Sequence, residues 1–287
     1  MTNYKKYLWL YPMLVLLIGL IGLIGGTKTV EVNPDSTTYH VLAAQVNRQI
    51  ATPLIMVPGT YGTQNRFDEM LATLKKTTPD LSVEKITVHT DGTLKVTGKI
   101  KKSSQHPVFV IAFEEAKDGI AAISQQAQWF QQALHSILDF YDFETYNFVG
   151  HSNGGLVFTE YLENLQTTDE PQVASMITLG TPYNDVVEEE NQNYQSAKVT
   201  EWLDHYLVSS IRQTNFEMIN IAGSLNNQAT DGTVPLASVQ MGAQIFQNKT
   251  EYQEKIVSAS HSNLTENEEV LALLSKVISV NSQNLSV

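Results

Sequence analysis

Short apolar runs alternate with amphipathic stretches along most of this chain. The apolar runs have the length and composition of buried strands: Pro53–Val57, Pro107–Phe113, Tyr146–Val149, Ala174–Leu179, Phe216–Ile221 and Lys255–Val257. Apolar residues recur at helical spacing in Ile120–Tyr141, after Ser152, and in Asn267–Ile278. Strands that alternate with helices form a mostly parallel central sheet covered by helices on both faces. The pattern therefore predicts an α/β fold.

One stretch departs from this alternation. Val83–His89 and Thr93–Ile100 alternate apolar and polar residues, and Asp91-Gly92 lies between them. Asp-Gly between two such runs is typical of a tight turn between antiparallel strands. The sequence therefore predicts an inserted β-hairpin that extends or covers an edge of the sheet.

The N-terminal part has a different pattern. Lys5 and Lys6 precede an apolar run, Tyr7–Ile24, which is near the length that spans a bilayer. Residues 1–26 are predicted to be a signal-anchor or a signal peptide, and the lack of an Ala-x-Ala site favours an uncleaved anchor. The lysines place the N-terminus in the cytoplasm. The expected location is the cell membrane, with the domain outside, or secretion if the segment is cleaved.

The remaining chain is expected to be a polar tether, residues 27–40, and one large domain, residues 41–287. The protein has 287 residues and a formal net charge of −12, which argues against nucleic acid as a partner. It contains no cysteine, so disulfides, thiolate metal sites and a cysteine nucleophile are excluded.

A glycine-rich motif follows the run that ends at Val149. Gly150-His151-Ser152-Asn153-Gly154 matches the G-x-S-x-G pattern of a nucleophile elbow. In such a turn, small residues on both sides of the serine let strand and helix approach closely. The alternative is a glycine-rich loop with an incidental serine. The strand before it and the helical pattern after it favour Ser152 as a nucleophile.

A serine nucleophile needs donors for the oxyanion that it creates. The backbone N–H of Asn153 is expected to be one donor. The second is expected from the loop Pro58–Thr63, which follows the first buried strand. Thr60 N–H is the predicted donor in this loop, with Tyr61 as the alternative.

The base and the acid are expected in loops at the carboxyl ends of later strands. His261 follows the last predicted strand, whereas His205 lies in a predicted helix, so His261 is the predicted base. Asp231 stands in Asp231-Gly232-Thr233, shortly after the Phe216–Ile221 strand, and is the predicted acid. Asp204 is the alternative to Asp231.

These motifs resemble an α/β-hydrolase, since the order Ser152, Asp231, His261 is typical of that fold. More narrowly, the chain resembles the membrane-anchored cell-surface hydrolases of Gram-positive bacteria, long listed as a domain of unknown function. The resemblance rests on Val-Pro-Gly-Thr-Tyr-Gly, Gly-His-Ser-Asn-Gly-Gly, Leu-Gly-Thr-Pro-Tyr-Asn, Asp-Gly-Thr-Val-Pro and Ser-His-Ser. Pro58 departs from it, because many relatives carry histidine there.

The resemblance and the candidate residues together imply a serine hydrolase that cleaves carboxylic esters through an acyl-enzyme. A peptidase or amidase with the same residues, and a non-catalytic surface binding module, remain alternatives. The expected partners are a small-molecule or lipid-like acyl substrate and, through the N-terminal segment, a membrane. No metal or organic cofactor is expected. Tyr183–Arg212 is predicted to be either a cap over Ser152 or an acidic loop with a helix that covers the core.

Overall fold

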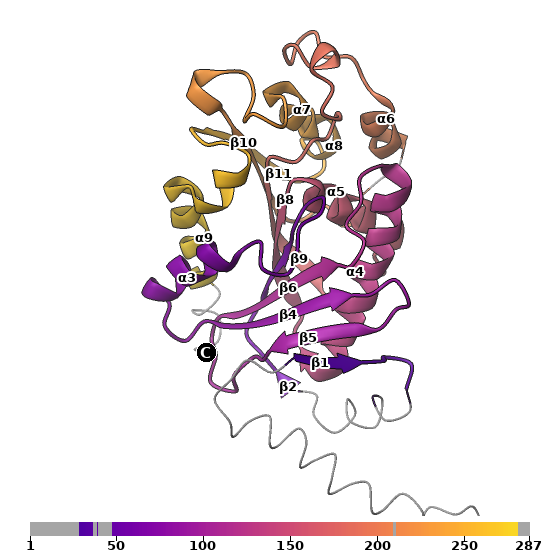
Figure 1. Ribbon diagram of the computed structural model, residues 1–287, viewed down its shortest axis with the longest axis vertical. Coiled ribbons are helices and arrows are strands. Elements are labelled where there is room, and N and C mark those ends of the chain that lie inside the picture. Colours follow the sequence, from indigo (N-terminus) through magenta and orange to yellow (C-terminus); the bar gives the residue numbers. More distant parts are fainter. Residues whose placement is uncertain (1–28, 37–38, 40–47, 209–210, 281–287) are drawn as a thin grey trace, which may run out of the picture.

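The computed structural model describes residues 29–36, 39, 48–208 and 211–280. Its centre is a sheet with the strand order β1-β5-β4-β6-β3-β8-β9-β10-β11, which counts nine strands within the described ranges (Figure 1). From one edge to the other the strands are β1 (Thr29–Val32), β5 (Leu94–Gly98), β4 (Ser82–Val88), β6 (Pro107–Phe113), β3 (Leu54–Val57), β8 (Thr145–His151), β9 (Gln172–Leu179), β10 (Glu217–Gly223) and β11 (Glu251–Val257). All neighbours from β4 to β11 are parallel. A mostly parallel α/β sheet is thereby confirmed.

Alternate side chains of each central strand belong to different hydrophobic layers. In β3, Ile55 and Val57 pack in one layer, whereas Leu54 and Met56 pack in the other. Helices α4 (Ile120–Phe140), α5 (Asn153–Glu160), α6 (Glu201–Val208) and α8 (Gly242–Phe246) cover the first layer; α3 (Asp68–Thr77) and α9 (Glu268–Val280) cover the second (Figure 1). Both faces of the sheet are therefore buried, as continuous apolar runs require.

Shorter elements complete the described part of the chain. They are the paired strands β2 (Arg48–Gln49) and β7 (Tyr141–Asp142), the π-helical turn η2 (Tyr161–Leu165), helix α7 (Leu236–Gln240), and the 3-10 turns η3 (Glu188–Glu190), η4 (Leu225–Asn227) and η5 (Ser262–Glu266).

The predicted hairpin is present and lies at one side of the sheet. β4 and β5 pair antiparallel, with Glu84 opposite Gly98 and Val88 opposite Leu94. The Asp91 carboxylate accepts the N–H of Thr93 at 2.9 Å and closes the turn. In the strand order, the hairpin lies toward the β1 edge of the sheet, whereas the strands β3 and β8 that precede the candidate functional loops lie nearer the middle.

Two regions differ from the sequence pattern at the sheet edges. Residues 29–32, which the sequence assigned to a tether, form β1 and pair antiparallel with β5. β11 begins at Glu251, four residues before the predicted start at Lys255. The sequence pattern missed these four residues because most side chains of this strand are exposed and polar. The side chains of an edge strand can be solvated on both faces and need not include regularly spaced apolar residues. These two strands therefore gave no hydrophobic pattern in the sequence.

Candidate active site

Ser152 occupies a strained turn between β8 and α5. Its backbone angles are φ 55° and ψ −132°, in a region that side chains other than glycine rarely adopt. Its N–H donates to Leu179 O at 2.8 Å, and its carbonyl accepts from Thr181 Oγ1 at 3.0 Å. The structure thus fixes both sides of this residue, as a nucleophile elbow requires.

The glycines around Ser152 are required by close approach of backbone to backbone. A Cβ at Gly150 would lie 2.6 Å from the nitrogen of Gly155. A Cβ at Gly154 would lie 2.2 Å from the oxygen of Val57, at the end of β3. Strand, helix and neighbouring strand therefore meet at a distance that only glycine permits.

The structure brings His261 and Asp231 into direct contact. His261 Nδ1 lies 2.7 Å from Asp231 Oδ2, and the His261 N–H donates to the Asp231 carbonyl at 2.9 Å. An ionised carboxylate only accepts, so Nδ1 carries the proton of a neutral His261 ring and Nε2 is left as an acceptor. This is the tautomer that a general base needs.

Backbone groups hold the second oxygen of Asp231. Asp231 Oδ1 accepts the N–H groups of Thr233 at 2.9 Å and Val234 at 2.7 Å. The residue is only 1% exposed. A buried carboxylate with hydrogen bonds on both oxygens keeps a single orientation, and Asp231 can therefore orient His261. Asp204, the alternative acid, lies on α6 and is exposed.

Ser152 and His261 both lie close to the Leu179–Gly180 segment. Ser152 N–H binds Leu179 O, and a Cβ at Gly180 would lie 3.0 Å from His261 Nδ1. Among the described residues, however, no hydrogen bond joins the Ser152 hydroxyl to His261. Such contacts are often long in enzymes without substrate and tighten when substrate binds. The role of Ser152, Asp231 and His261 as a triad therefore stays a prediction.

A second histidine supports the loop of His261, and sequence reasoning missed it. His151 Nε2 lies 3.0 Å from the backbone oxygen of His261, and the two rings are 4.7 Å apart between centroids. Burial, together with His261 and Arg66, lowers the pKa of His151 to about 3. The neutral ring donates from Nε2 to His261 O, while Arg66 Nη2 donates to Ser262 O at 2.6 Å. The position inside the elbow was its only signal in the sequence.

The loop after β3 lies against Ser152. A Cβ at Gly59 would be 2.5 Å from Ser152 Cβ and 3.1 Å from its Oγ, so the backbone of this loop approaches the hydroxyl closely. The N–H of Tyr61 donates to Ala116 O at 2.7 Å. The N–H of Tyr61, the alternative oxyanion donor, is thus already engaged, whereas no hydrogen bond occupies the N–H of Thr60 among the described residues. The assignment of either N–H to an oxyanion stays a prediction.

The other candidate residues lie apart from this cluster. His205 pairs with Glu160, with 2.7 Å between Nε2 and Oε2. Helix α6 turns Leu203 and Tyr206 into the core, and the described part of Tyr183–Arg212 therefore includes a helix that covers apolar side chains. Within the described ranges, no group of three His, Cys, Asp or Glu side chains is placed to hold a metal ion.

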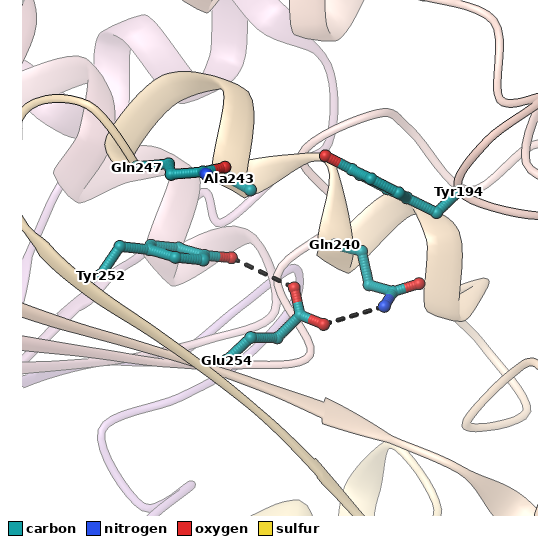
Figure 2. Close-up of a pocket in the computed structure, with 6 residues that line it drawn as sticks. All are labelled: Tyr194, Gln240, Ala243, Gln247, Tyr252 and Glu254. Carbon is teal, nitrogen blue, oxygen red and sulfur yellow. Dashed lines mark hydrogen bonds between the residues drawn. The ribbon is translucent and has the colours of Figure 1, made fainter.

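A cavity of about 360 Å³ lies beside α7, α8 and β11, away from the Ser152 loop. Figure 2 shows Glu254 between two other lining residues, accepting hydrogen bonds from Gln240 Nε2 at 2.8 Å and from the Tyr252 hydroxyl at 3.3 Å. Tyr252 and Glu254 lie within β11, whereas His261 follows its carboxyl end. The hydrogen-bond geometry, and not this cavity, therefore locates the candidate active site.

The sheet order, the strained Ser152 turn and the His261–Asp231 pair define an α/β-hydrolase. The family model described as alpha/beta hydrolase of unknown function (DUF915) matches residues 42–280. The chain belongs to this family, which confirms the resemblance seen in the sequence.

Solved structures agree with this assignment. A protein from Lactobacillus plantarum described as a cell surface hydrolase is 32% identical, with 80% of this chain and 90% of that chain covered and a TM-score of 0.65. The lin2722 product from Listeria innocua is 24% identical, covering 78% and 92%, with a TM-score of 0.70. A Bacillus licheniformis lipase shares the fold at 12% identity, covering 88% and 98%, with a TM-score of 0.51. None of the curated proteins matches the chain.

The predicted N-terminal anchor, residues 1–26, lies outside the described residues. Among the residues that the structure does describe, no helix has the length and apolar character to cross a bilayer. The assignment of residues 1–26 therefore stays a prediction.

Proposed function

We propose that this protein is a serine hydrolase that cleaves carboxylic esters, with Ser152 as nucleophile, His261 as base and Asp231 as the acid that orients it. One observation carries the proposal: His261 Nδ1 lies 2.7 Å from Asp231 Oδ2, on a carboxylate that backbone groups already hold. Ser152 itself lies in a strained turn, and strained backbone conformations are concentrated at functional sites.

The reaction proceeds through an acyl-enzyme. His261 Nε2 takes the Ser152 proton as Oγ attacks the ester carbonyl carbon. The N–H groups of Asn153 and Thr60 stabilise the oxyanion. The imidazolium gives its proton to the leaving alcohol, and a water activated by the same ring then releases the acid. An ester is the expected substrate because resonance stabilises an amide bond more than an ester, so that an ester carbonyl is attacked more readily.

The substrate class is a small or lipid-like ester near a membrane. The apolar run Tyr7–Ile24 supports an anchor that holds the domain at the outer cell surface. The similar protein from Lactobacillus plantarum is named a cell surface hydrolase, which supports this location. The described part of Tyr183–Arg212 is the proposed cap of the acyl-chain site.

A fluorophosphonate probe tests the nucleophile directly. The wild-type protein should be labelled and should hydrolyse p-nitrophenyl esters. Ser152→Ala should lose labelling and at least about 10⁴-fold in kcat, because the base then has no hydroxyl to activate. Ser103→Ala, in an exposed turn before β6, is the control and should behave as wild type. A wild-type protein that stays unlabelled would indicate a binding module, and faster turnover of peptide anilides than of esters would indicate an amidase.

Asp231→Asn tests the orienting carboxylate. The asparagine oxygen should keep the N–H groups of Thr233 and Val234, so its NH₂ faces His261 Nδ1. The ring must then carry its proton on Nε2 and cannot accept from Ser152. We expect kcat to fall by about 10³–10⁴-fold with the fold retained by circular dichroism. Activity within a few-fold of wild type would show that Asp231 is not the acid.

A further inference from the structure

The side chain of Asn153 joins three elements next to the candidate nucleophile. It is 4% exposed, at the first turn of α5. Its Nδ2 lies 2.6 Å from Thr60 Oγ1, in the loop after β3, and 2.7 Å from Asp118 Oδ1, which precedes α4. One amide group therefore touches both the proposed oxyanion loop and a carboxylate.

The carboxylate determines the direction of every hydrogen bond in this group. An ionised Asp118 only accepts, so the NH₂ end of Asn153 must face it. The same nitrogen faces Thr60 Oγ1, and Thr60 must therefore accept as well. A threonine hydroxyl has one proton of its own, which must then point away from Asn153. Within the described ranges, no acceptor receives that proton.

The surrounding loop brings Thr60 close to Ser152, because Thr60 follows Gly59 and its Oγ1 contacts the side chain of Asn153, the residue after Ser152. Gly59 packs against the Cβ and Oγ of Ser152. The N–H of Gly62 donates to Gly59 O at 2.8 Å within the loop, and the N–H of Tyr61 donates to Ala116 O at 2.7 Å in the segment after β6. The loop conformation is therefore held from both sides. Thr60 is thus a residue of this loop with two donors to offer, its N–H and its hydroxyl.

We propose that the Thr60 hydroxyl is a third donor to the oxyanion, held in its donating orientation by Asn153, which Asp118 in turn orients. Thr60 is a catalytic residue in this arrangement, whereas Asn153 and Asp118 are positioning residues. The hydroxyl shares its proton with the negative oxygen and transfers nothing, so no bond to it forms or breaks. The inference rests on the proposed serine hydrolase function.

Thr60→Val removes the hydroxyl and keeps the shape and the backbone N–H. We expect kcat on a p-nitrophenyl ester to fall by about 10²-fold with little change in KM, since the lost bond forms only at the charged oxygen. Affinity for a trifluoromethyl ketone, whose adduct carries the oxyanion, should fall by a similar factor. Thr60→Ser should restore most of both. Thr168→Val, an exposed threonine in the turn before β9, is the control outside the proposed oxyanion loop and should leave kcat unchanged.

The positioning role of Asn153 is tested by coupling. Asn153→Ala should lower kcat about 10-fold because the hydroxyl loses its fixed orientation. The double variant Thr60→Val with Asn153→Ala should be no slower than Thr60→Val alone, since Asn153 acts through the hydroxyl. Additive losses would overturn the positioning role.

The outcomes separate this inference from the proposed function. An unlabelled wild-type protein contradicts the serine hydrolase itself. A labelled protein in which Thr60→Val keeps wild-type kcat, or in which Thr60→Ser is as slow as Thr60→Val, contradicts only the hydroxyl donor. Should Thr60→Val fail to fold, Thr60→Ala against Thr60→Ser gives the same comparison.

Discussion

Glu163 is a buried acid without a partner for its charge. It lies in η2 and is 4% exposed, and neither carboxylate oxygen has a hydrogen bond among the described residues. Burial raises the pKa of Glu163 from the ordinary 4.5 to about 8, although the nearby Lys249 opposes this. The folded protein therefore keeps the proton over a pH range in which the unfolded chain has lost it.

The linkage makes Glu163 a source of pH-dependent stability. The raised pKa means that the folded state binds more protons between pH 4.5 and 8, so the free energy of unfolding falls as pH rises through this window. Glu163→Gln resembles the protonated acid and should be more stable than wild type by about 2–4 kcal/mol at pH 8.5. The difference should shrink toward pH 4.5 in urea unfolding.

The exposed Glu189 offers a matched substitution. Glu189→Gln is the control, because Glu189 is exposed in the folded protein, and its free energy of unfolding should stay close to that of wild type. An equal effect of Glu163→Gln at both ends of the pH range would mean that the residue acts through packing and not through its proton.

At the scale of elements, the junction of β3, β8 and α5 depends on Gly154. A Cβ there would meet backbone oxygen of Val57 at 2.2 Å, and backbone cannot move aside as a side chain can. Gly154→Ala should lower the free energy of unfolding by about 3 kcal/mol or more and reduce activity, because α5 must shift.

Gly119 provides the comparison for that substitution. Its φ is +102°, and a Cβ there would meet nothing within 4 Å. Gly119→Ala should therefore cost only backbone strain, about 1–3 kcal/mol. Thermal unfolding of both variants measures the difference. If Gly119→Ala proved the more damaging, the close approach at Gly154 would not be what limits this junction.

Buried elements were predictable and edge elements were not. Pro107–Phe113 was predicted at its observed bounds, because a strand covered on both faces is apolar throughout. β1 and the first half of β11 lie at the sheet edges, where solvated side chains carry no period. Glu251, Glu254 and Lys255 on β11 are charges of the kind that discourage pairing between sheet edges.

At the candidate site, the sequence predicted the individual residues but not all of the contacts between them. Ser152, Asp231 and His261 were named from the loops that they occupy, and the structure joins His261 to Asp231. The contacts of His151 with His261 and of Asn153 with Thr60 and Asp118 were not foreseen. They connect residues distant in sequence, and no local pattern marks which side chains will meet.

At the scale of the whole molecule, the predicted N-terminal anchor should attach the protein to a membrane. The full chain should sediment with membranes and require detergent for release, because Tyr7–Ile24 is apolar over nearly a bilayer thickness. A chain that starts at Thr27 should stay in the supernatant. Leu16→Arg in the full chain places a charge in the run and should weaken retention. Soluble protein that lacks residues 1–26 would instead show cleavage and secretion.

The pairing of β1 with β5 limits the distance between the folded domain and the N-terminal apolar run. Only residues 25–28 separate the apolar run from Thr29, the first residue of β1. Even a fully stretched chain of that length reaches about 18 Å, whereas a free tether of residues 27–40 would reach about 50 Å. If the N-terminal run is embedded in the membrane, this short linker keeps the hydrolase domain close to the lipid surface. The esters that it can reach are then those at or near that surface.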